Sequence, residues 1–494
     1  MSLCRSLPIV SLLAAGLLLA ACTVGPDYQR PAAPLPADFK HEQGWRTVPP
    51  QSWAASGEWW RAFDDPVLTG LLDQAAAANQ TLAQAQARFR AAEARWADAR
   101  SGYSPVLSAS VEGQRRGSDE SRSVVTGSTV RSGRITESYS AGFNLNWVPD
   151  LWGRVRRQVE ADRAGLQASA ADLAAVRLSM RVSLAQSYVR LRALDRQMAL
   201  LRQTMEAYDR SLELTRNQYN AGIVARSDVI QAQTQSQSLR TELSDLRNQR
   251  AAEENAIAVL IGRAPSEFAL APADRLPTVP ALPATLPGVL ISRRPDVVVA
   301  ERQVAAANAR IGVARAAWLP ELTLSASYGV EADRFGDLLD APVRVWSVGP
   351  SLAQTLFDGG ARRAANDLAL AEYDEQVALY RQTVLESLQE VEDALAALRF
   401  LTRQSEQQDA LLALARDNLR VVTNRYRAGM VTFLEVASAQ DLALEAQRAQ
   451  LRILADRLNA SIRLAAAIGG GWDLDDPVVQ TVVEPPRPWE DEAQ

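Results

Sequence analysis

Hydrophobic and polar residues along this chain follow two different periods, and each period predicts a different element. Two segments, 81–100 and 297–318, are rich in Ala, Arg and Glu, which favour helices, and a proline ends each of them. After each segment apolar and small polar residues alternate, as in SYSAGFNLNW at 138–147, which predicts strands with one apolar and one small polar face. The predicted strands are 105–113, 134–148, 320–331 and 343–356.

The segments between and after the strands predict loops and very long helices. The Gly-, Ser- and Arg-rich link 113–134 and the shorter link 332–342 are typical of solvated surface loops. From Arg154 to Gln218 there is no proline, and 361–428 contains neither proline nor glycine. At about 1.5 Å per residue such helices are roughly 100 Å long, so each must lie along other helices in a coiled-coil-like array.

The two halves of the chain repeat each other. YNAGIVARSDV at 219–229 and YRAGMVTFLEV at 426–436 match at an offset of 207 residues, and the same offset pairs Gly153 with Gly360. Before the strands the offset is 215, and one change of loop length accounts for the difference. The chain is therefore interpreted as two copies of one unit, each made of a helix, two strands and a long helical hairpin.

These two repeated sequences, called the words below, lie at the turns of the predicted hairpins, at the start of the returning helices at 226–261 and 433–468. Gly222 and Gly429 supply the positive φ or the close approach that a tight turn needs. Apolar residues at such an exposed turn favour a contact surface over a packing role. Asp228 and Glu435 lie in the first turns of the returning helices, where the helix dipole favours anions, so helix-start chemistry is as good an explanation for them as function.

The N-terminus predicts export and a lipid anchor. MSLCRSLPIVSLLAAGLLLAAC combines Arg5 with an apolar run at 7–19 that is too short to span a bilayer and is typical of a signal peptide. Leu19-Ala20-Ala21-Cys22 resembles the bacterial lipoprotein box, which implies cleavage before Cys22 and its acylation; an ordinary signal peptide is the alternative. The mature chain would keep one cysteine, which excludes a disulfide framework.

Composition argues against an enzyme. The 494 residues carry a formal charge of −5, which gives no reason to expect nucleic acid. One His and two Cys nearly exclude a zinc site, and a catalytic triad would have to rest on His41 in a Pro-rich segment. We expect no metal and no cofactor apart from the covalent lipid on Cys22.

The number of strands predicts an oligomer. The alternating strands fit either a soluble sheet packed on a core or a membrane barrel with its apolar face on lipid, and an exported lipoprotein favours the barrel. Four strands cannot close a barrel, and an open sheet in lipid would leave unpaired edges. Copies of the chain must then share one barrel, and any number from two upward is open at this point.

Several motifs resemble one family over essentially the whole mature chain. They are TVGPDYQRP at 23–31, WWRAFDDPVL at 59–68, RRPDV at 293–297, FDGG at 357–360 and the two Ala-Gly hairpin words. Together they resemble the TolC/OprM-like outer membrane factor family, and most closely its lipidated, NodT-like branch. These proteins are the outer-membrane channels of tripartite efflux systems of the RND type.

The resemblance implies a fold and a function. The fold would be mixed and mainly α, a homotrimer with a twelve-stranded outer-membrane β-barrel, a twelve-helix periplasmic α-barrel and a small equatorial domain. The trimer would be a passive conduit for drugs or other small molecules, opened by a periplasmic membrane-fusion adaptor and powered by an inner-membrane transporter. A channel for protein or peptide secretion of type I is the nearer alternative, and a non-channel periplasmic coiled-coil lipoprotein the more distant one.

The resemblance also implies site residues at the hairpin turns. The adaptor-docking tips would be Ala221, Gly222, Ile223, Val224, Ala225, Ala428, Gly429, Met430, Val431 and Thr432. The periplasmic gate would be formed by Asp228, Tyr426, Leu434 and Glu435. The family often has an acidic residue where this chain has Ser438, which puts an acidic ring at that level in doubt.

The expected organisation divides the chain into six parts. They are the signal peptide 1–21, the lipidated and equatorial segment 22–80, the first repeat 81–262, the Pro-rich equatorial linker 263–292, the second repeat 293–469 and the tail 470–494.

Overall fold

The computed structural model describes residues 23–33, 40, 58–125, 128–280, 294–340 and 342–470. The expected signal peptide, Cys22, the end of the linker and the tail after residue 470 lie outside these described residues. The contacts divide the chain into two compact units. Unit 1 comprises 1–31, 91–166 and 302–378, and unit 2 comprises 32–90, 167–301 and 379–494.

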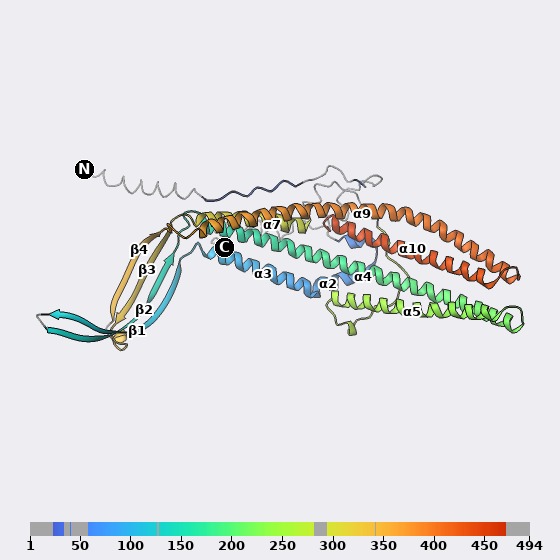
Figure 1. The fold of residues 1–494 in the computed structure, drawn as a ribbon, viewed down its shortest axis with the longest axis horizontal. Coiled ribbons are helices and arrows are strands. Elements are labelled where there is room, and N and C mark those ends of the chain that lie inside the picture. Colours follow the sequence, from blue (N-terminus) through green and yellow to red (C-terminus); the bar gives the residue numbers. More distant parts are fainter. Residues whose placement is uncertain are drawn as a thin grey trace. The chain divides into compact units, whose positions relative to one another are not determined.

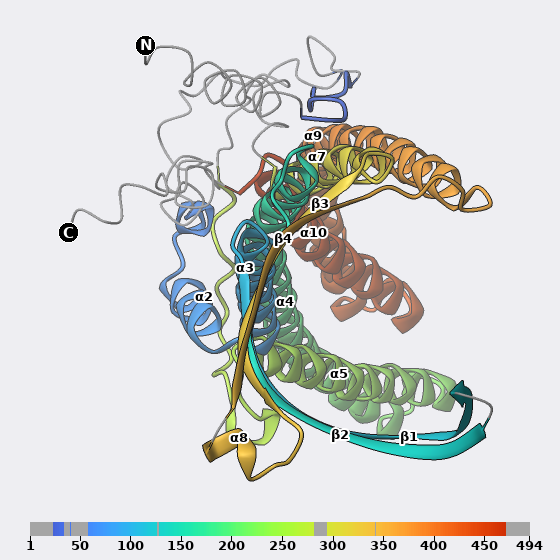
Figure 2. The same cartoon turned by 90° about the vertical axis from the view of Figure 1, so that its left-hand side faces the viewer.

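Unit 1 contains one antiparallel sheet, visible as the curved ribbon in Figure 2. Its strands are β1 (Val106–Val125), β2 (Ser128–Trp147), β3 (Glu321–Ala332) and β4 (Val343–Ala353). They lie in the order β1-β2-β3-β4, so each strand pairs with its neighbours in the sequence. The outer edges of the sheet, on β1 and β4, have no partner strand among the described residues.

The predicted alternation of faces is confirmed by the strand register. One row of partners on the apolar face consists of Ala109, Phe143, Tyr328 and Trp346. The next row, on the opposite face, consists of Ser108, Asn144, Ser327 and Ser347. The hydroxyl oxygens of Ser327 and Ser347 lie 2.8 Å apart, so small polar side chains bond to one another across that face. Among the described residues Phe143, Tyr328 and Trp346 on the apolar face are 55%, 57% and 75% exposed.

The loop predicted at 113–134 was wrong. The pairing of β1 with β2 continues to Val125 and Ser128, whereas β2 pairs with β3 only from Tyr139 onward. The first two strands therefore extend beyond the four-stranded part as a two-stranded ribbon. Antiparallel pairing satisfies the inward-facing backbone groups of such a ribbon whatever the side chains are, so its polar composition misled the prediction. The second link is shorter and contains one helical turn, α8 (Asp337–Asp340).

The long helices occur in pairs of equal length. In each pair one helix comes from the first half of the chain and the other from the second half. Helices α3 (Gln80–Ser101) and α7 (Pro295–Ala316) have 22 residues each. Helices α4 (Arg154–Asn220) and α9 (Ala361–Arg427) have 67 residues each, and α5 (Arg226–Leu260) and α10 (Phe433–Ala467) have 35 each. The α4–α5 and α9–α10 hairpins are the long helical pairs in Figure 1. No helix in the described ranges is long and apolar enough to cross a membrane.

The predicted lateral packing of the long helices is confirmed in unit 2. Along α4 the buried Leu184, Leu191 and Met198 recur every seven residues, which is the spacing of a coiled-coil seam. One buried cluster joins three helices and consists of Leu194, Met198, Leu201 and Tyr208 on α4, Leu239, Leu243 and Leu246 on α5, and Leu444 on α10. Each helix is thus held by its neighbours over several turns.

A second cluster places short elements against the middle of α4. The helical turn η1 (Trp59–Phe63) and helix α2 (Pro66–Ala78) bury their apolar side chains there, and Tyr188 of α4 donates a hydrogen bond to Asp65 at 2.8 Å. Asp65 also caps α2 by accepting from two backbone N–H groups. The WWRAFDDPVL motif therefore has a packing role.

The start of the linker is fastened by a buried ion-pair network. The Asp195 carboxylate, whose side chain is almost fully buried, accepts from the guanidinium groups of Arg192 at 3.1 Å and Arg250 at 2.7 Å. It also accepts from the backbone N–H of Ala273 at 3.2 Å, and Arg192 donates to the carbonyl of Ala271 at 2.8 Å. These bonds hold the linker against α4 and α5, because a buried charge is stable only when it is paired.

Two further sequence motifs are held against helices by polar contacts. In unit 1, Arg157 of α4 pairs with Asp27 at 2.8 Å, and the side-chain amide of Asn308 in α7 donates to the Pro26 carbonyl at 2.9 Å. In unit 2, Arg294 bonds Glu390 of α9 at 2.7 Å and the last carbonyl of α10 at 3.0 Å. The TVGPD and RRPDV motifs are thus explained by packing.

We predict that Gly262→Ala destabilises unit 2 more than Gly222→Ala does. Both glycines end a helix with positive φ, +71° and +76°, so alanine is strained by a similar amount at each, about 1–2 kcal/mol. A Cβ at 262 would also overlap the Ala78 carbonyl, whereas nothing lies within 4 Å at 222. Urea unfolding followed by circular dichroism should give an additional loss of about 1–3 kcal/mol for Gly262→Ala. Equal losses would contradict this packing of α2.

Candidate functional site at the hairpin tips

The first hairpin turns through a glycine-ended helix cap. Gly222 has φ +76°, its N–H donates to the carbonyl of Tyr219 at 2.9 Å, and the N–H of Ile223 donates to the carbonyl of Gln218 at 2.8 Å. This pair of bonds is the Schellman motif, which satisfies the last carbonyls of a helix and needs a left-handed residue at its centre. The Gly222 prediction is therefore confirmed for the turn.

The second hairpin turns in the same way. Gly429 has φ +70°, its N–H donates to the carbonyl of Tyr426 at 2.9 Å, and the N–H of Met430 donates to the carbonyl of Arg425 at 3.0 Å. Every donor and acceptor lies 207 residues after its counterpart in the first turn. The two tips therefore present side chains from equivalent backbone positions.

The residues predicted to dock an adaptor form these turns. In the first turn Ala221, Gly222, Ile223 and Ala225 are exposed and Val224 is half-buried; in the second Ala428, Gly429, Met430 and Thr432 are exposed and Val431 is half-buried. The apolar side chains of Ile223 and Met430 are 71% and 64% exposed. Each tip thus offers one large apolar side chain to the solvent.

Three of the predicted gate residues lie just beyond the turns. The carboxylate of Asp228 accepts from the backbone N–H of Ala225 at 3.3 Å, which is helix-start chemistry within its own hairpin. Leu434 and Glu435 are exposed at the start of α10, and Ser438 is exposed one turn later. Among the described residues, no hydrogen bond or ion pair joins Asp228 to Glu435 or Ser438.

The fourth predicted gate residue, Tyr426, joins the two hairpins. It is 6% exposed, and its hydroxyl donates to the side-chain oxygen of Gln218 on α4 at 2.6 Å. Its ring packs edge-on against Phe433 of α10, with centroids 6.0 Å apart. Ala232 of α5 lies in the same buried cluster, so side chains from all four helices meet at this point.

Sequence reasoning missed the partners of Tyr426. Gln218 lies just before the repeated sequence at 219–229, and Phe433 lies within the one at 426–436, but sequence analysis assigned a role to neither. A usable signal is the difference between the copies, because Phe433 corresponds to Arg226 at the offset of 207 residues. Positions where a repeat departs from itself indicate contacts that only one copy makes.

Sequence reasoning also missed a polar contact between the hairpins that lies further from the turns than Tyr426. Asp441 on α10 accepts from the hydroxyl of Tyr208 on α4 at 2.9 Å and from the side-chain amide of Gln235 on α5. Burial, and next the Asp441 carboxylate, raise the pKa of the Tyr208 hydroxyl, so this group stays a proton donor. Seven residues further along, Arg448 of α10 pairs with Glu242 of α5. The hairpins are therefore cross-linked at a heptad spacing.

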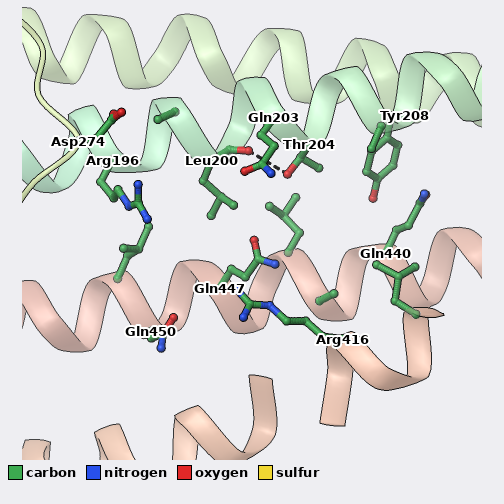
Figure 3. Close-up of a pocket in the computed structure, with 16 residues that line it drawn as sticks. Arg196, Leu200, Gln203, Thr204, Tyr208, Asp274, Arg416, Gln440, Gln447 and Gln450 are labelled. Carbon is green, nitrogen blue, oxygen red and sulfur yellow. Dashed lines mark hydrogen bonds between the residues drawn. The ribbon is translucent and has the colours of Figure 1, made fainter. Parts of the chain in front are cut away.

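A groove of about 740 Å³ lies between α4, α9 and α10. Figure 3 shows polar side chains reaching into it from all three helices, namely Arg196, Gln203, Arg416, Gln440, Gln447 and Gln450. The hydroxyl of Thr204 instead turns back to the Leu200 carbonyl of its own helix, at 2.9 Å. Such a lining differs from the mostly apolar, enclosed pockets that bind small ligands tightly. No group of metal-binding side chains occurs among the residues that the structure describes.

The chain matches one protein-family model, described as the outer membrane efflux protein family, over residues 71–263 and 286–470. The two matched segments contain the two long hairpins and both tips.

Individual proteins and structures match over almost the full length. A probable efflux pump outer membrane protein, TtgC of Pseudomonas putida, is 31% identical over 470 residues, covering 94% of this chain and 96% of that protein. The pyoverdine export outer membrane protein OpmQ of Pseudomonas aeruginosa is 33% identical over 474 residues, covering 95% and 98%. The solved structure of the outer-membrane channel OprN superposes with a TM-score of 0.84 at 31% identity, covering 91% of this chain and 100% of that one.

Proposed function

The chain belongs to the outer membrane efflux protein family and is an outer-membrane efflux channel, and from that premise we propose that three copies form one conduit. In this assembly three four-stranded sheets close a twelve-stranded β-barrel in the outer membrane, and twelve long helices form a tunnel in the periplasm. The conduit is passive and carries out no chemistry.

The uncovered apolar face of the sheet carries this proposal. Trp346 and Val348 on β4 and Phe143 on β2 are exposed within the chain, while the opposite face is lined by small polar groups. Apolar side chains facing lipid and polar ones facing a wet lumen are the pattern of a membrane barrel. The unpaired edges of β1 and β4 support closure by other copies, because backbone groups in lipid must be bonded.

The long helices support lateral contact between copies. On α9, large apolar side chains that are exposed among the described residues include Leu379, Leu411 and Leu414. A neighbouring hairpin of another copy would cover them. We also propose that the chain arose from two copies of one unit, since paired elements have equal lengths and the tips share their hydrogen bonds. Six equivalent hairpins would then line a near-symmetric tunnel.

The remaining parts of the chain fit the same assembly. Residues 1–21 would be the cleaved signal peptide, and a lipid on Cys22 would anchor the protein on the periplasmic side of the outer membrane. Residues within 22–80 and 263–292 would form an equatorial collar around the tunnel, which is supported by the packing of η1, α2 and the start of the linker on α4. The tail 470–494 has no assigned role.

Energy and cargo come from partners. A periplasmic membrane-fusion adaptor would join the tips to an inner-membrane transporter of the RND type. The polar groove lining suits hydrated passage better than tight binding, so the cargo would be drugs or other small molecules selected by the transporter. The names of TtgC and OpmQ, as an efflux pump protein and a pyoverdine export protein, support small-molecule cargo.

Single-particle electron microscopy of the protein, purified in detergent from outer membranes, tests the assembly. We expect a three-fold symmetric hollow particle with an end that carries six hairpin tips. Intact-mass spectrometry of the same sample should give a chain that begins at an acylated Cys22. Solid or monomeric particles would contradict the channel, and an unmodified Cys22 would contradict the anchor alone.

The exposed apolar residues at the tips would dock the adaptor. Replacing both Ile223 and Met430 by Glu should abolish efflux-dependent resistance in cells that rely on this protein, because each buried charge would oppose an apolar contact. The matched control is Val259→Glu, an exposed apolar residue at the other end of α5. Native electrophoresis should show trimers for both proteins. Normal resistance in the double variant would contradict tip docking.

The gate residues would hold the hairpins together in the closed state. Tyr426 donates to Gln218 of the other hairpin, whereas Asp228 accepts from Ala225 at the turn of its own. Asp228→Ala combined with Tyr426→Phe therefore removes the bond between the hairpins and loosens one tip, and should shift the closed–open equilibrium by about fivefold or more and raise the conductance of planar bilayers. Leu434 and Glu435 would add an apolar and an acidic ring just beyond the tips. Asp417→Ala, which removes a surface carboxylate bonded to Arg420 of its own helix, serves as the control. An unchanged conductance would contradict this gate.

A further inference from the structure

One arginine interrupts the apolar face of the sheet. The row of strand partners that contains it consists of Val111, Ala141, Val330 and Arg344. Arg344 is exposed and makes no hydrogen bond or ion pair with the described residues. An arginine on a lipid-facing strand is tolerated close to the bilayer surface, because its energetic cost falls steeply from the midplane toward the headgroups. Arg344 therefore marks the level of the lipid headgroups.

Arg344 lies at the end of the sheet that is farther from the helices. The other ends of the strands, at Val106, Trp147, Glu321 and Ala353, adjoin α3, α4, α7 and α9 in the chain. In the assembly proposed above these helices cross the periplasm, so Arg344 lies at the level of the outer leaflet. The outer leaflet of such a membrane consists largely of a glycolipid whose polar head carries phosphate groups.

The same face of the sheet carries further arginines beyond the four-stranded part, where β1 and β2 continue alone (Figure 1). The register places Arg115 opposite Glu137 and, after the irregularity at 118–121, Arg122 opposite Arg131. Along β2, positions 137 and 131 are even numbers of residues away from Phe143, so they belong to its face. Like charges directly opposite each other destabilise a strand pair, so an anion bound between Arg122 and Arg131 would stabilise the ribbon.

The heights of these positions indicate how large the anionic head must be. The ring of Tyr139 packs edge-on against Phe335, with centroids 5.8 Å apart, and such aromatic residues lie at the bilayer surface. At about 3.3 Å per residue Arg131 lies roughly 26 Å along the strand beyond Tyr139, and a tilt of about 40° leaves roughly 20 Å of height. The headgroup layer of a simple phospholipid is only about 5–8 Å deep. A lipid with a phosphorylated sugar head reaches both levels.

We propose that an outward rim, defined as Arg115, Arg122, Arg131 and Arg344, binds phosphate groups of the outer-leaflet glycolipid. The inference rests on the barrel proposed above. The side chain of Arg115 is 69% exposed, and its contact with Glu137 at 3.2 Å uses only its Nε. An exposed ion pair of this kind contributes little, so a phosphate competes with it successfully. Guanidinium groups bind phosphate through two parallel, charge-assisted hydrogen bonds.

The acyl chains of the same lipid would cover the apolar side chains below the rim. Trp346 lies two residues from Arg344 on the same face of β4 and is 75% exposed. One lipid molecule therefore satisfies two features of the outer face, a cation without a partner among the described residues and an aromatic ring open to solvent. This combination favours a lipid over a free phosphate ion.

Two neighbouring features define the controls. Arg116 lies next to Arg115 but on the opposite face, where its strand partner is Thr136. Asp333, Asp337 and Asp340 are exposed in the link between β3 and β4, and the strand register assigns them to neither face. Divalent cations would bridge these carboxylates to phosphate, so the test is made in the presence of a chelator.

Native mass spectrometry of the full-length protein in detergent tests the rim without any variant. The probes are lipid A with two phosphates and the same lipid after removal of both phosphates. We expect the phosphorylated form to bind at least about tenfold more tightly, because the acyl chains are identical and only the charge-assisted bonds differ. Equal affinities would overturn the proposal, since the apolar face alone would then hold the lipid.

Inorganic phosphate separates a lipid site from a site for free anions. It lacks the acyl chains that pack on the apolar face, so the same concentration of inorganic phosphate should displace little of the bound lipid A. Complete displacement would identify a site for free anions and overturn the docking of a lipid.

Variants assign the effect to residues. Arg115→Gln combined with Arg344→Gln should lower the affinity for lipid A about tenfold or more, whereas Arg116→Gln should leave it unchanged. Arg122→Gln combined with Arg131→Gln should weaken binding only of a glycolipid with a phosphorylated sugar core, because these positions lie higher. An equal loss for Arg116→Gln would overturn the assignment to the outward face.

The same spectra give the number of chains in each particle, which distinguishes the two proposals. Trimers that bind both forms of lipid A equally would overturn the rim and leave the barrel intact. Monomers would overturn the proposed assembly itself.

Discussion

A helix of 67 residues has no interior of its own, and the rest of this structure follows from that constraint. At roughly 100 Å it can persist only if neighbouring helices bury one stripe of it along its course. In unit 2 the heptad of Leu184, Leu191 and Met198 provides that stripe, and α5 and α10 cover it further along. The hairpin is the simplest solution, since a tight glycine turn returns the chain alongside itself.

The same constraint explains why the polar bonds lie between hairpins. Apolar seams set the distance between helices but specify their register less strictly, because a shift by one heptad restores similar apolar contacts. Asp441 with Tyr208, and Arg448 with Glu242, recur at the seam's own spacing and so fix the register of α10 against α4 and α5. Tyr426 and Gln218 do the same at the tips. A conduit that opens at its end needs contacts of this kind, which are specific and individually weak.

The sheet differs from the helices, because its own elements do not cover its apolar face. Its four strands satisfy one another's backbone groups, yet they leave an apolar face and two edges uncovered. The apolar face is unfavourable in water, and the unpaired edges are unfavourable in lipid, where no water bonds to their backbone groups. The face and the edges of the sheet are thus the features that support the proposal of a barrel shared by several copies.

Much of this protein could be predicted from its sequence, because the deciding physics is local. Apolar residues that recur every second residue predicted the strands and their faces, and those that recur about every three and a half residues predicted the long helices. The two Ala-Gly sequences predicted the turns, because glycine adopts a positive φ without strain. The repeat determined that both halves share one plan. Even the failure at 113–134 is local in origin, since a polar ribbon and a polar loop have the same composition.

Only the tertiary structure decided which of two equivalent side chains is buried. Tyr219 and Tyr426 stand in nearly identical words, and nothing within either word says that one donates to Gln218 while the other faces solvent. Burial depends on what lies across the gap from each side chain, and here that is the other hairpin, 208 residues away in the sequence. The same holds for Asp228, whose local hydrogen bond to Ala225 became visible only once the backbone was in place.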